Sequence, residues 1–100
     1  MAREKFQTLT EPMFYILLAL RHEYCGVGIM KKIKNMTNHR VIVGPGTLYT
    51  LLSSFAAAGL IRETTIEGRK RSYIINDTGV QLLQTEYTRM HFLVDDYRKY

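Results

Sequence analysis

Residues 44–73 decide the fold, and they read GPGTLYTLLSSFAAAGLIRETTIEGRKRSY. The first half predicts a helix over residues 45–58, which Pro45 opens and Gly59 closes. Its apolar stripe has the helical spacing i, i+3, i+4, i+7 and consists of Leu48, Leu51, Leu52 and Phe55. The second half predicts a β-hairpin with a basic turn, and its strands are residues 60–67 and 71–75. A helix followed by a hairpin with a cationic tip is typical of a winged helix-turn-helix, whose helix enters a DNA groove while the hairpin contacts the backbone.

Two shorter helices are expected before residue 44. Thr10 is a suitable N-cap for the first, which has Glu11 in its opening turn and Pro12 near its start. The second follows a break at residues 25–28. Helical spacing predicts their inward residues, which are Met13, Ile16, Leu17 and Leu20 in the first and Ile29, Met30, Ile33 and Met36 in the second. The sequence therefore predicts a mainly α-helical fold with one small β-hairpin.

The C-terminal segment predicts a long helix with one apolar face. Asn76 can cap this helix. Its apolar residues alternate three and four positions apart, and they are Val80, Leu83, Tyr87, Met90, Val94 and Tyr97. Such spacing favours association between helices, and a lone projecting helix would expose much apolar surface. We therefore expect a homodimer with this stripe in its interface. The alternative, a helix folded back over its own three-helix core, stays open.

A second apolar row on the first helix bears on the same question. Phe14 and Leu18 lie beside the core stripe of that helix. One interpretation is that this row contacts a second subunit and belongs to the dimer interface. The other is that the helix is buried on more than one side within a small core, and the sequence favours neither. The expected organisation is a winged helix-turn-helix with an N-terminal arm over residues 1–76. A C-terminal dimerisation helix over residues 77–100 continues the same compact unit.

Composition limits the class of protein. One hundred residues form one domain, and a hydrophobic share of 46% is sufficient for a globular core. The formal charge of +5 suits a polyanionic partner without proving one. The one cysteine, Cys25, excludes an internal disulfide and suits a reducing compartment. No window holds the roughly 18 apolar residues of a membrane span, and the N-terminal segment carries no export signal, so we expect a cytoplasmic protein without membrane contact.

Catalysis and metal binding find little support in the sequence. The spacing of His22, Cys25 and His39 fits no zinc pattern. The segment Gly26-Val27-Gly28 is too short for a nucleotide-binding loop and follows no convincing strand. We therefore expect no enzyme, no metal ion and no cofactor.

The outer face of the third predicted helix is small and hydroxylic. A projection at about 100° per residue places Gly46, Thr50, Ser53 and Ala57 opposite the apolar stripe. Tyr49 flanks this face on one side, and Thr47 and Ser54 flank it on the other. The face lacks the Arg, Lys, Asn and Gln that make bidentate contacts to bases, but its hydroxyls can touch phosphates, thymine methyl groups or water-bridged base edges. We expect these residues to contact DNA; the alternatives are a solvated face and a Tyr49 that packs against the neighbouring helix.

Cations near this helix are candidate phosphate ligands. Arg69, Lys70 and Arg71 occupy the hairpin tip, where long cationic side chains can reach the DNA backbone or minor groove. Arg71 begins the second strand, so it also fits a role in bracing the hairpin. Lys31, Lys32 and Lys34 on the second helix flank the same region. Phosphate contact is one interpretation of these lysines, and a solvated helix face is the other.

Two motifs resemble the PadR family of bacterial transcriptional regulators. They are GTLYTLLSSFAAAGLI from Gly46 and EGRKRSYIINDTG from Glu67, within a resemblance that runs from about residue 8 to residue 83. The resemblance implies a winged helix, a homodimer formed by the tail helix, and usually repression. It also associates Tyr49 with contact to the DNA backbone. The chain departs from the family pattern at two places: Ala56 stands where the family often has an acidic residue, and Gly26-Val27 stands where it commonly has Gly-Tyr. These departures affect the details of docking on DNA more than the fold.

The leading hypothesis is therefore a sequence-specific, homodimeric repressor that binds double-stranded DNA at a pseudo-palindromic operator. The resemblance also implies a response to a small aromatic effector, which some members of the family show. The aromatic residues that we consider for its cavity are Phe14, Tyr15, Phe92 and Tyr97. The alternative hypothesis is a winged-helix module that binds proteins and not DNA. The small, uncharged face of the third helix motivates that alternative.

Overall fold

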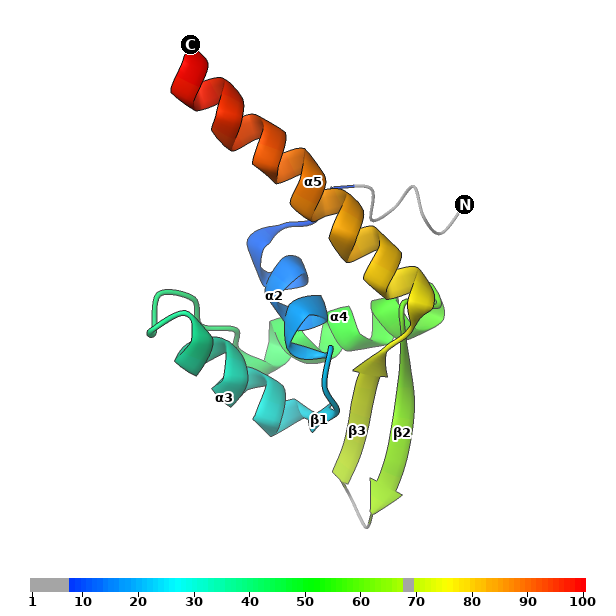
Figure 1. Ribbon diagram of the computed structural model, residues 1–100. Helices are drawn as coiled ribbons and strands as arrows, with labels where there is room; N and C mark the ends of the chain where they lie inside the picture. The colour runs from blue at the N-terminus through cyan, green and yellow to red at the C-terminus, as the bar shows by residue number, and fades with distance from the viewer. Residues whose placement is uncertain (1–7, 68–69) are drawn as a thin grey trace.

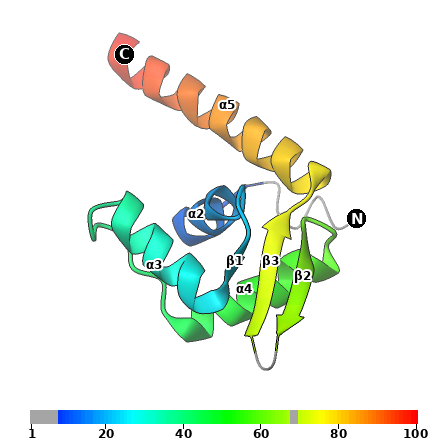
Figure 2. The same cartoon turned by 60° about the horizontal axis from the view of Figure 1, so that its bottom comes forward.

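The computed structural model describes residues 8–67 and 70–100. Helices and strands follow in the order α2 (Glu11–Ala19), β1 (Tyr24–Cys25), α3 (Gly26–Met36), α4 (Pro45–Ala57), β2 (Ile61–Glu67), β3 (Lys70–Ile75) and α5 (Asp77–Lys99). Helices α2, α3 and α4 pack around one core beside the sheet, and α5 runs across α2 and out beyond it (Figures 1 and 2). Of the predicted N-terminal arm, residues 1–9, only residues 8 and 9 are described, and Arg69 also lies outside the described residues.

The capping residue of α2 defines where the helix begins, and its apolar spacing defines which side is buried. The Thr10 hydroxyl accepts a hydrogen bond from the amide of Met13 at 3.4 Å, and Pro12 stands in the first turn, as predicted. The predicted inward residues Ile16, Leu17 and Leu20 are fully buried. Met13 is partly buried and packs against this core.

Helix α3 follows its predicted pattern except at its end. Ile29 and Ile33 are fully buried, but Met36, predicted to point inward, is 36% exposed, so that prediction was wrong. Thr37 takes the inward position in its place. Its hydroxyl donates to the carbonyl of Ile33 at 2.8 Å and accepts from the amide of Val41 at 3.1 Å, which closes the helix around a buried polar group.

Gly59 follows the C-cap of α4 and terminates the helix, as the sequence predicts. Gly59 has a φ of +77°, a left-handed conformation that favours glycine. The amide of Leu60 donates to the carbonyl of Phe55 at 2.9 Å, and the amide of Gly59 donates to that of Ala56 at 3.1 Å. This paired bonding is a Schellman motif, and it turns the chain directly from α4 into β2.

The sheet has a third strand that the sequence pattern did not predict. Its strands lie in the order β1-β3-β2 and are all antiparallel. Strand β1 is only two residues long, and Tyr24 pairs with Tyr73 while Cys25 pairs with Ser72. The pairing places the start of α3 beside the hairpin, because Gly26 follows β1 directly.

Helix α5 begins with a cap and a close contact. The side chain of Asn76 accepts a hydrogen bond from the amide of Gly79 at 3.2 Å, as expected for an N-cap. Gly79 is buried against the end of α4: a Cβ atom there would lie 2.3 Å from the carbonyl oxygen of Leu60. Only the first half of α5 joins the core, through Leu82 and Leu83, and the second half projects away from it (Figure 1).

A buried carboxylate connects α5 to the start of the described chain. Glu86 is fully buried, and its oxygens accept hydrogen bonds from the amide of Leu9 at 2.5 Å and from Arg89 at 2.5 and 3.0 Å. Arg89, together with the Leu9 amide, lowers the pKa of Glu86 against the opposing effect of burial. The sequence pattern assigned no role to Glu86.

Candidate nucleic-acid interface

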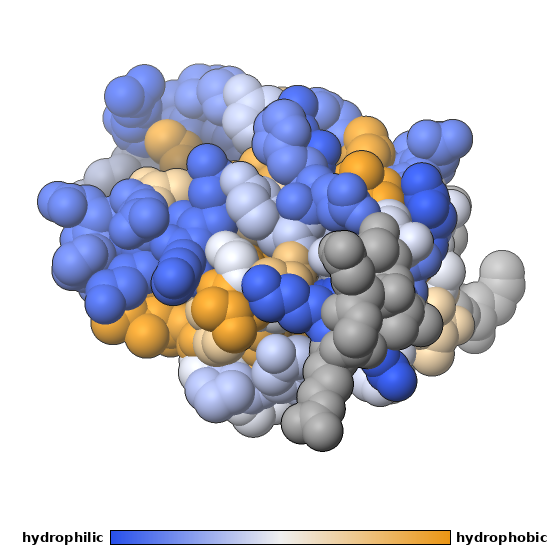
Figure 3. Space-filling view, turned by 90° about the horizontal axis from the view of Figure 1, so that it is seen from below, coloured by the Kyte–Doolittle hydropathy of each residue, from blue (hydrophilic) through white to orange (hydrophobic). Residues whose placement is uncertain are grey.

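The predicted outer face of α4 is open to solvent. The residues placed on it or at its flanks are exposed except Ser54, which is half-buried; the exposed ones are Gly46, Thr47, Tyr49, Thr50, Ser53 and Ala57. The apolar residues Leu48, Leu52 and Phe55 are buried on the opposite side, and Leu51 is partly buried. Figure 3 shows the underside of the molecule, where hydrophilic side chains dominate and small apolar patches lie between them. Helix α4 is therefore available to a partner along its hydroxylic side.

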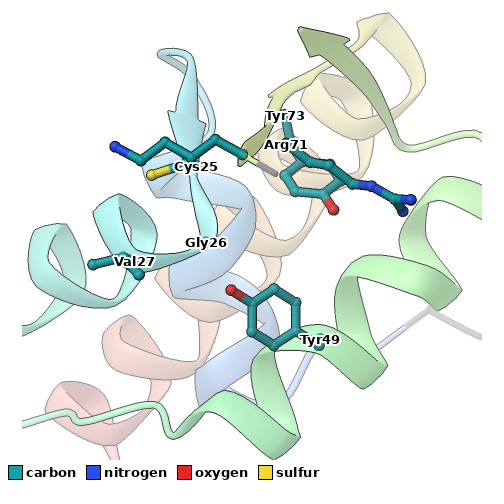
Figure 4. A pocket seen from close by; sticks show the side chains of 7 residues that line it. Cys25, Gly26, Val27, Tyr49, Arg71 and Tyr73 are labelled. Atoms are coloured by element: carbon teal, nitrogen blue, oxygen red, sulfur yellow. The ribbon is translucent and has the colours of Figure 1, made fainter. Parts of the chain in front are cut away.

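Tyr49 links α4 to a cleft beside the hairpin. The cleft has a volume of about 340 Å³ and is lined by Cys25, Gly26, Val27, Tyr49, Lys70, Arg71 and Tyr73. The Tyr49 ring lies against Gly26, and its hydroxyl points to the start of α3 (Figure 4). The side chain is nevertheless 48% exposed. Tyr49 thus both packs against the neighbouring helix and presents an accessible edge.

Lys70 and Arg71 supply positive charge on the hairpin side of this cleft. Both are exposed. The guanidinium of Arg71 lies 3.8 Å from the Glu63 carboxylate on β2, an exposed ion pair that contributes little stability but orients the side chain. Burial, and then the Glu63 charge, raise the pKa of the Tyr73 hydroxyl above its ordinary value against the opposing effect of Arg71.

The lysines of α3 lie away from this cleft. Lys31, Lys32 and Lys34 are exposed, and none of them is among the described residues that line the cleft. Helix α3 starts beside β1 and runs away from the hairpin (Figure 1). Lys31 and Lys34 therefore form a separate basic stretch on the second helix.

A second hollow flanks α4 on the side opposite the hairpin cleft, and sequence reasoning did not find it. It has a volume of about 600 Å³ and is lined by Thr10, Pro12, Met13, Gly46, Thr47, Thr50 and Leu51. The start of α2 forms one wall and the first two turns of α4 form the other. No local signal in the sequence indicates that these two helix starts lie side by side.

Several residues of the predicted dimer interface meet in one apolar groove. Phe14 and Leu18 of α2 face Val80, Leu83 and Tyr87 of α5, and together with Arg21 and Gln84 they line a volume of about 280 Å³. Leu83 is nearly buried at 8% exposure, whereas Val80 and Tyr87 are about half exposed. Farther along α5, Val94 and Tyr97 are 55% and 86% exposed, and Met90 is partly buried.

The predicted aromatic cavity is not enclosed within one chain. Phe14 and Tyr15 contact each other edge to face at 5.9 Å between ring centroids. Phe92 and Tyr97, however, are 63% and 86% exposed on the projecting part of α5. The hydroxyl of Tyr15 accepts a hydrogen bond from Arg40 at 2.6 Å, which directs it toward the α3–α4 loop.

Residues 8–67 and 70–100 contain neither a metal cluster nor a membrane span. Within those ranges no three His, Cys, Asp or Glu side chains gather closely enough to hold a metal ion. None of the helices described there combines the length and the apolar character of a membrane span.

Helices α2, α3 and α4, the antiparallel sheet and the direct passage from α4 into the hairpin define a winged helix-turn-helix protein. The model of the Transcriptional regulator PadR-like family matches residues 16–85, which is more than half of the chain. The chain therefore belongs to this family of DNA-binding transcriptional regulators, and the resemblance noted in the sequence is confirmed.

Solved structures support the same fold. A transcriptional regulator from Clostridium thermocellum is 18% identical with a TM-score of 0.77, covering 90% of this chain and 91% of that one. A PadR family regulator from Eggerthella lenta DSM 2243 is 23% identical with a TM-score of 0.72, covering 88% and 75%. Bacillus subtilis PadR in complex with operator DNA is 26% identical with a TM-score of 0.66, covering 75% and 46%. No curated protein sequence matches the chain significantly.

Proposed function

We propose that this protein is a homodimeric, sequence-specific repressor that occupies a pseudo-palindromic operator with α4 of each subunit in the major groove. One observation carries the proposal. Tyr49 on the exposed side of α4, the start of α3 and the hairpin cations Lys70 and Arg71 meet around one cleft (Figure 4). A surface of this kind combines a helix that fits a groove with cations that contact the backbone beside it. Bacillus subtilis PadR, which is 26% identical to this chain, was solved in complex with operator DNA, and this supports DNA as the partner.

Phosphate contacts are assigned to the cleft side of the surface. Lys70, Arg71 and the Tyr49 hydroxyl can reach one stretch of backbone, because all three line the same cleft. Arg69 at the hairpin tip is assigned the same role from the sequence. Lys31 and Lys34 are assigned a separate backbone contact along α3. Such contacts position the protein and make its affinity depend on salt.

The dimer is proposed to form through α5. Its projecting half exposes Val94 and Tyr97, and the groove formed with α2 exposes Val80 and Tyr87. Exposed apolar residues at heptad spacing are stabilised when a second copy covers them. Two-fold symmetry then presents two α4 helices to successive major grooves, about one DNA turn apart. A dimer bound over a promoter represses transcription by occupying the promoter. Because its proposed partner is DNA, we place the protein in the cytoplasm.

The test begins with DNA fragments from the source genome that the protein retains at low salt, followed by sequencing of those fragments. Fluorescence anisotropy on the recovered site then compares wild type with the double variant Tyr49→Ala, Lys70→Ala. We expect weaker binding and a salt dependence flatter by about one unit for each phosphate group that the variant no longer neutralises. Lys99→Ala is the control, because it removes a cation far from the cleft. Unchanged affinity in the double variant would refute the docking assignment.

Protein binding without DNA binding is the second candidate function. The absence of Arg, Lys, Asn and Gln from the outer face of α4 favours it, since those residues supply most bidentate base contacts. Failure to retain random or genomic DNA at micromolar protein and low salt would favour this alternative over the first.

A small aromatic effector is proposed as a regulator of the dimer. The apolar groove that contains Phe14, Leu18 and Tyr87 has a volume of about 280 Å³ and lies on the proposed subunit contact. A ligand bound there would change how the two subunits meet. Thermal melting and release from the operator, measured across a panel of aromatic compounds, test this idea. If neither responds to any compound, the effector is rejected.

A further inference from the structure

The outer side of α4 carries no side chain that makes a bidentate hydrogen bond to a base. Its exposed residues are Gly46, Thr47, Thr50, Ser53, Ala56 and Ala57. The one larger polar side chain, Tyr49, turns toward the cleft and lies against Gly26 (Figure 4). Base recognition along the centre of α4 is thus left to hydroxyl groups and methyl groups.

The hollow beside Thr47 and Thr50 is an independent observation that points to an apolar partner group. Pro12, Met13 and Leu51 give it hydrocarbon walls, and among the described residues that line it none is charged. A phosphate placed there would lose water without gaining a cation, which is unfavourable. A methyl group would be stabilised, because its apolar surface leaves water.

We propose that Thr47 and Thr50 recognise thymine bases through the C5-methyl group, with that methyl directed toward the hollow. This inference rests on the proposed function, since it assumes that α4 lies in the major groove. Thymine is the only base of unmodified DNA that presents a methyl group on its major-groove edge, and a threonine methyl is a suitable contact for it. The cations and Tyr49 hold the backbone at the opposite flank of α4.

Deoxyuridine gives the most direct test, because it differs from thymidine only by the missing C5-methyl group. Duplexes selected from a random pool define the bound half-site, and each thymine in it is then replaced in turn. At a recognised thymine we expect binding to weaken about fourfold, the value for one methyl-sized group removed from water. Replacement in both half-sites should weaken it roughly fifteenfold, since two equal contributions multiply.

Paired variants separate the methyl group of threonine from its hydroxyl group. Thr50→Ser keeps the hydroxyl and removes the methyl, whereas Thr50→Val does the reverse. The serine variant should bind thymine and uracil duplexes with equal affinity, and the valine variant should still prefer thymine. The same pair is made at Thr47. Thr88→Ser, on an exposed part of α5, is the matched control and should leave the preference unchanged.

Each outcome decides the inference. Equal affinity for thymine and uracil at every position overturns it, although operator binding and the proposed function would both stand. A serine variant that keeps the preference, or a valine variant that loses it, also overturns it and assigns recognition to the hydroxyl. Failure to bind any duplex at low salt is a separate result, which refutes the proposed function itself and this inference with it.

Discussion

The contact between Gly26 and Tyr49 yields a prediction that separates function from stability. A Cβ atom at Gly26 would lie 2.3 Å from the Tyr49 hydroxyl oxygen, 2.8 Å from Cζ and 2.9 Å from Cε1. Side-chain Cβ atoms essentially never approach another atom closer than 3.0 Å, so Gly26→Ala must displace something. All three contacts belong to the end of one half-exposed side chain. The ring of Tyr49 should therefore swing out of the cleft while the backbone stays in place.

Stability should change little in this variant. Gly26 is not among the residues with a positive φ, so alanine fits the backbone there. Alanine at the start of a helix contributes up to about 0.5–1 kcal/mol relative to glycine, which offsets part of the packing that the Tyr49 ring loses. Thermal melting should therefore show a shift of only a few degrees.

Operator affinity should fall much more. If each subunit loses one hydrogen bond from Tyr49 to a phosphate, the net loss is about 1 kcal/mol per subunit and about 2 kcal/mol per dimer. Binding would weaken roughly thirtyfold. Fluorescence anisotropy on the selected operator measures this, and Tyr49→Phe, which keeps the ring and removes only the hydroxyl, should give a loss of similar size.

A double-mutant cycle tests the cause. On a Tyr49→Ala background, Gly26→Ala has no ring to displace, so it should not weaken binding further. Equal weakening on both backgrounds would show that Gly26 acts by another route. Unchanged operator affinity in Gly26→Ala alone would refute the reasoning, because it would mean that the seated ring makes no contribution to binding.

Three further predictions concern the packing of α5. Gly79→Ala should lower stability by about 1–3 kcal/mol, because the new Cβ would meet the Leu60 carbonyl at 2.3 Å and backbone cannot move aside cheaply; a melting temperature equal to or above that of wild type would contradict this. Glu86→Gln should be less stable than wild type at neutral pH. The pKa of Glu86 is lower in the folded state than its unfolded value of 4.5, so the ionised carboxylate contributes stability above pH 4.5. The difference in stability between wild type and variant should therefore shrink as the pH falls below 4.5 through the folded pKa. Urea titrations at several pH values measure this. Tyr87→Glu should give a monomer in light scattering and lose operator binding, since it places a charge in the apolar groove, whereas Thr88→Glu should stay dimeric.

The parts of the fold that depend on local signals could be predicted from the sequence. Thr10, Gly59 and Asn76 each satisfy backbone groups within four residues of their own position, so residue type and spacing were enough. The hydroxylic face of α4 was predicted for the same reason. Strand β1 was missed because two residues carry no periodicity, and its pairing with β3 joins distant parts of the chain.

Other features depend on long-range packing that no pattern shows. A glutamate such as Glu86 is usually a surface residue of a helix. Its carboxylate is nevertheless buried, and it accepts a hydrogen bond from the amide of Leu9 near the other end of the chain. Met36 fits the apolar stripe of α3, but the Thr37 hydroxyl closes that helix and takes the inward position. In the candidate site, the sequence order alone placed Lys70 and Arg71 beside α4. The contact of Tyr49 with Gly26 depends on how closely α3 approaches α4, and the sequence pattern does not show that distance.

Leu60 joins the proposed DNA-binding helix to the proposed dimerisation helix. Its amide closes α4 by bonding to the carbonyl of Phe55, and its carbonyl accepts a hydrogen bond at 3.0 Å from Asn76, the cap of α5. Gly79 in the first turn of α5 packs on that same carbonyl. The end of α4 and the start of α5 are thus held against one residue, with little freedom to move separately. In a dimer, any ligand that changes the angle between the two α5 helices would change the spacing of the two α4 helices, and an operator with half-sites about one DNA turn apart is sensitive to that spacing.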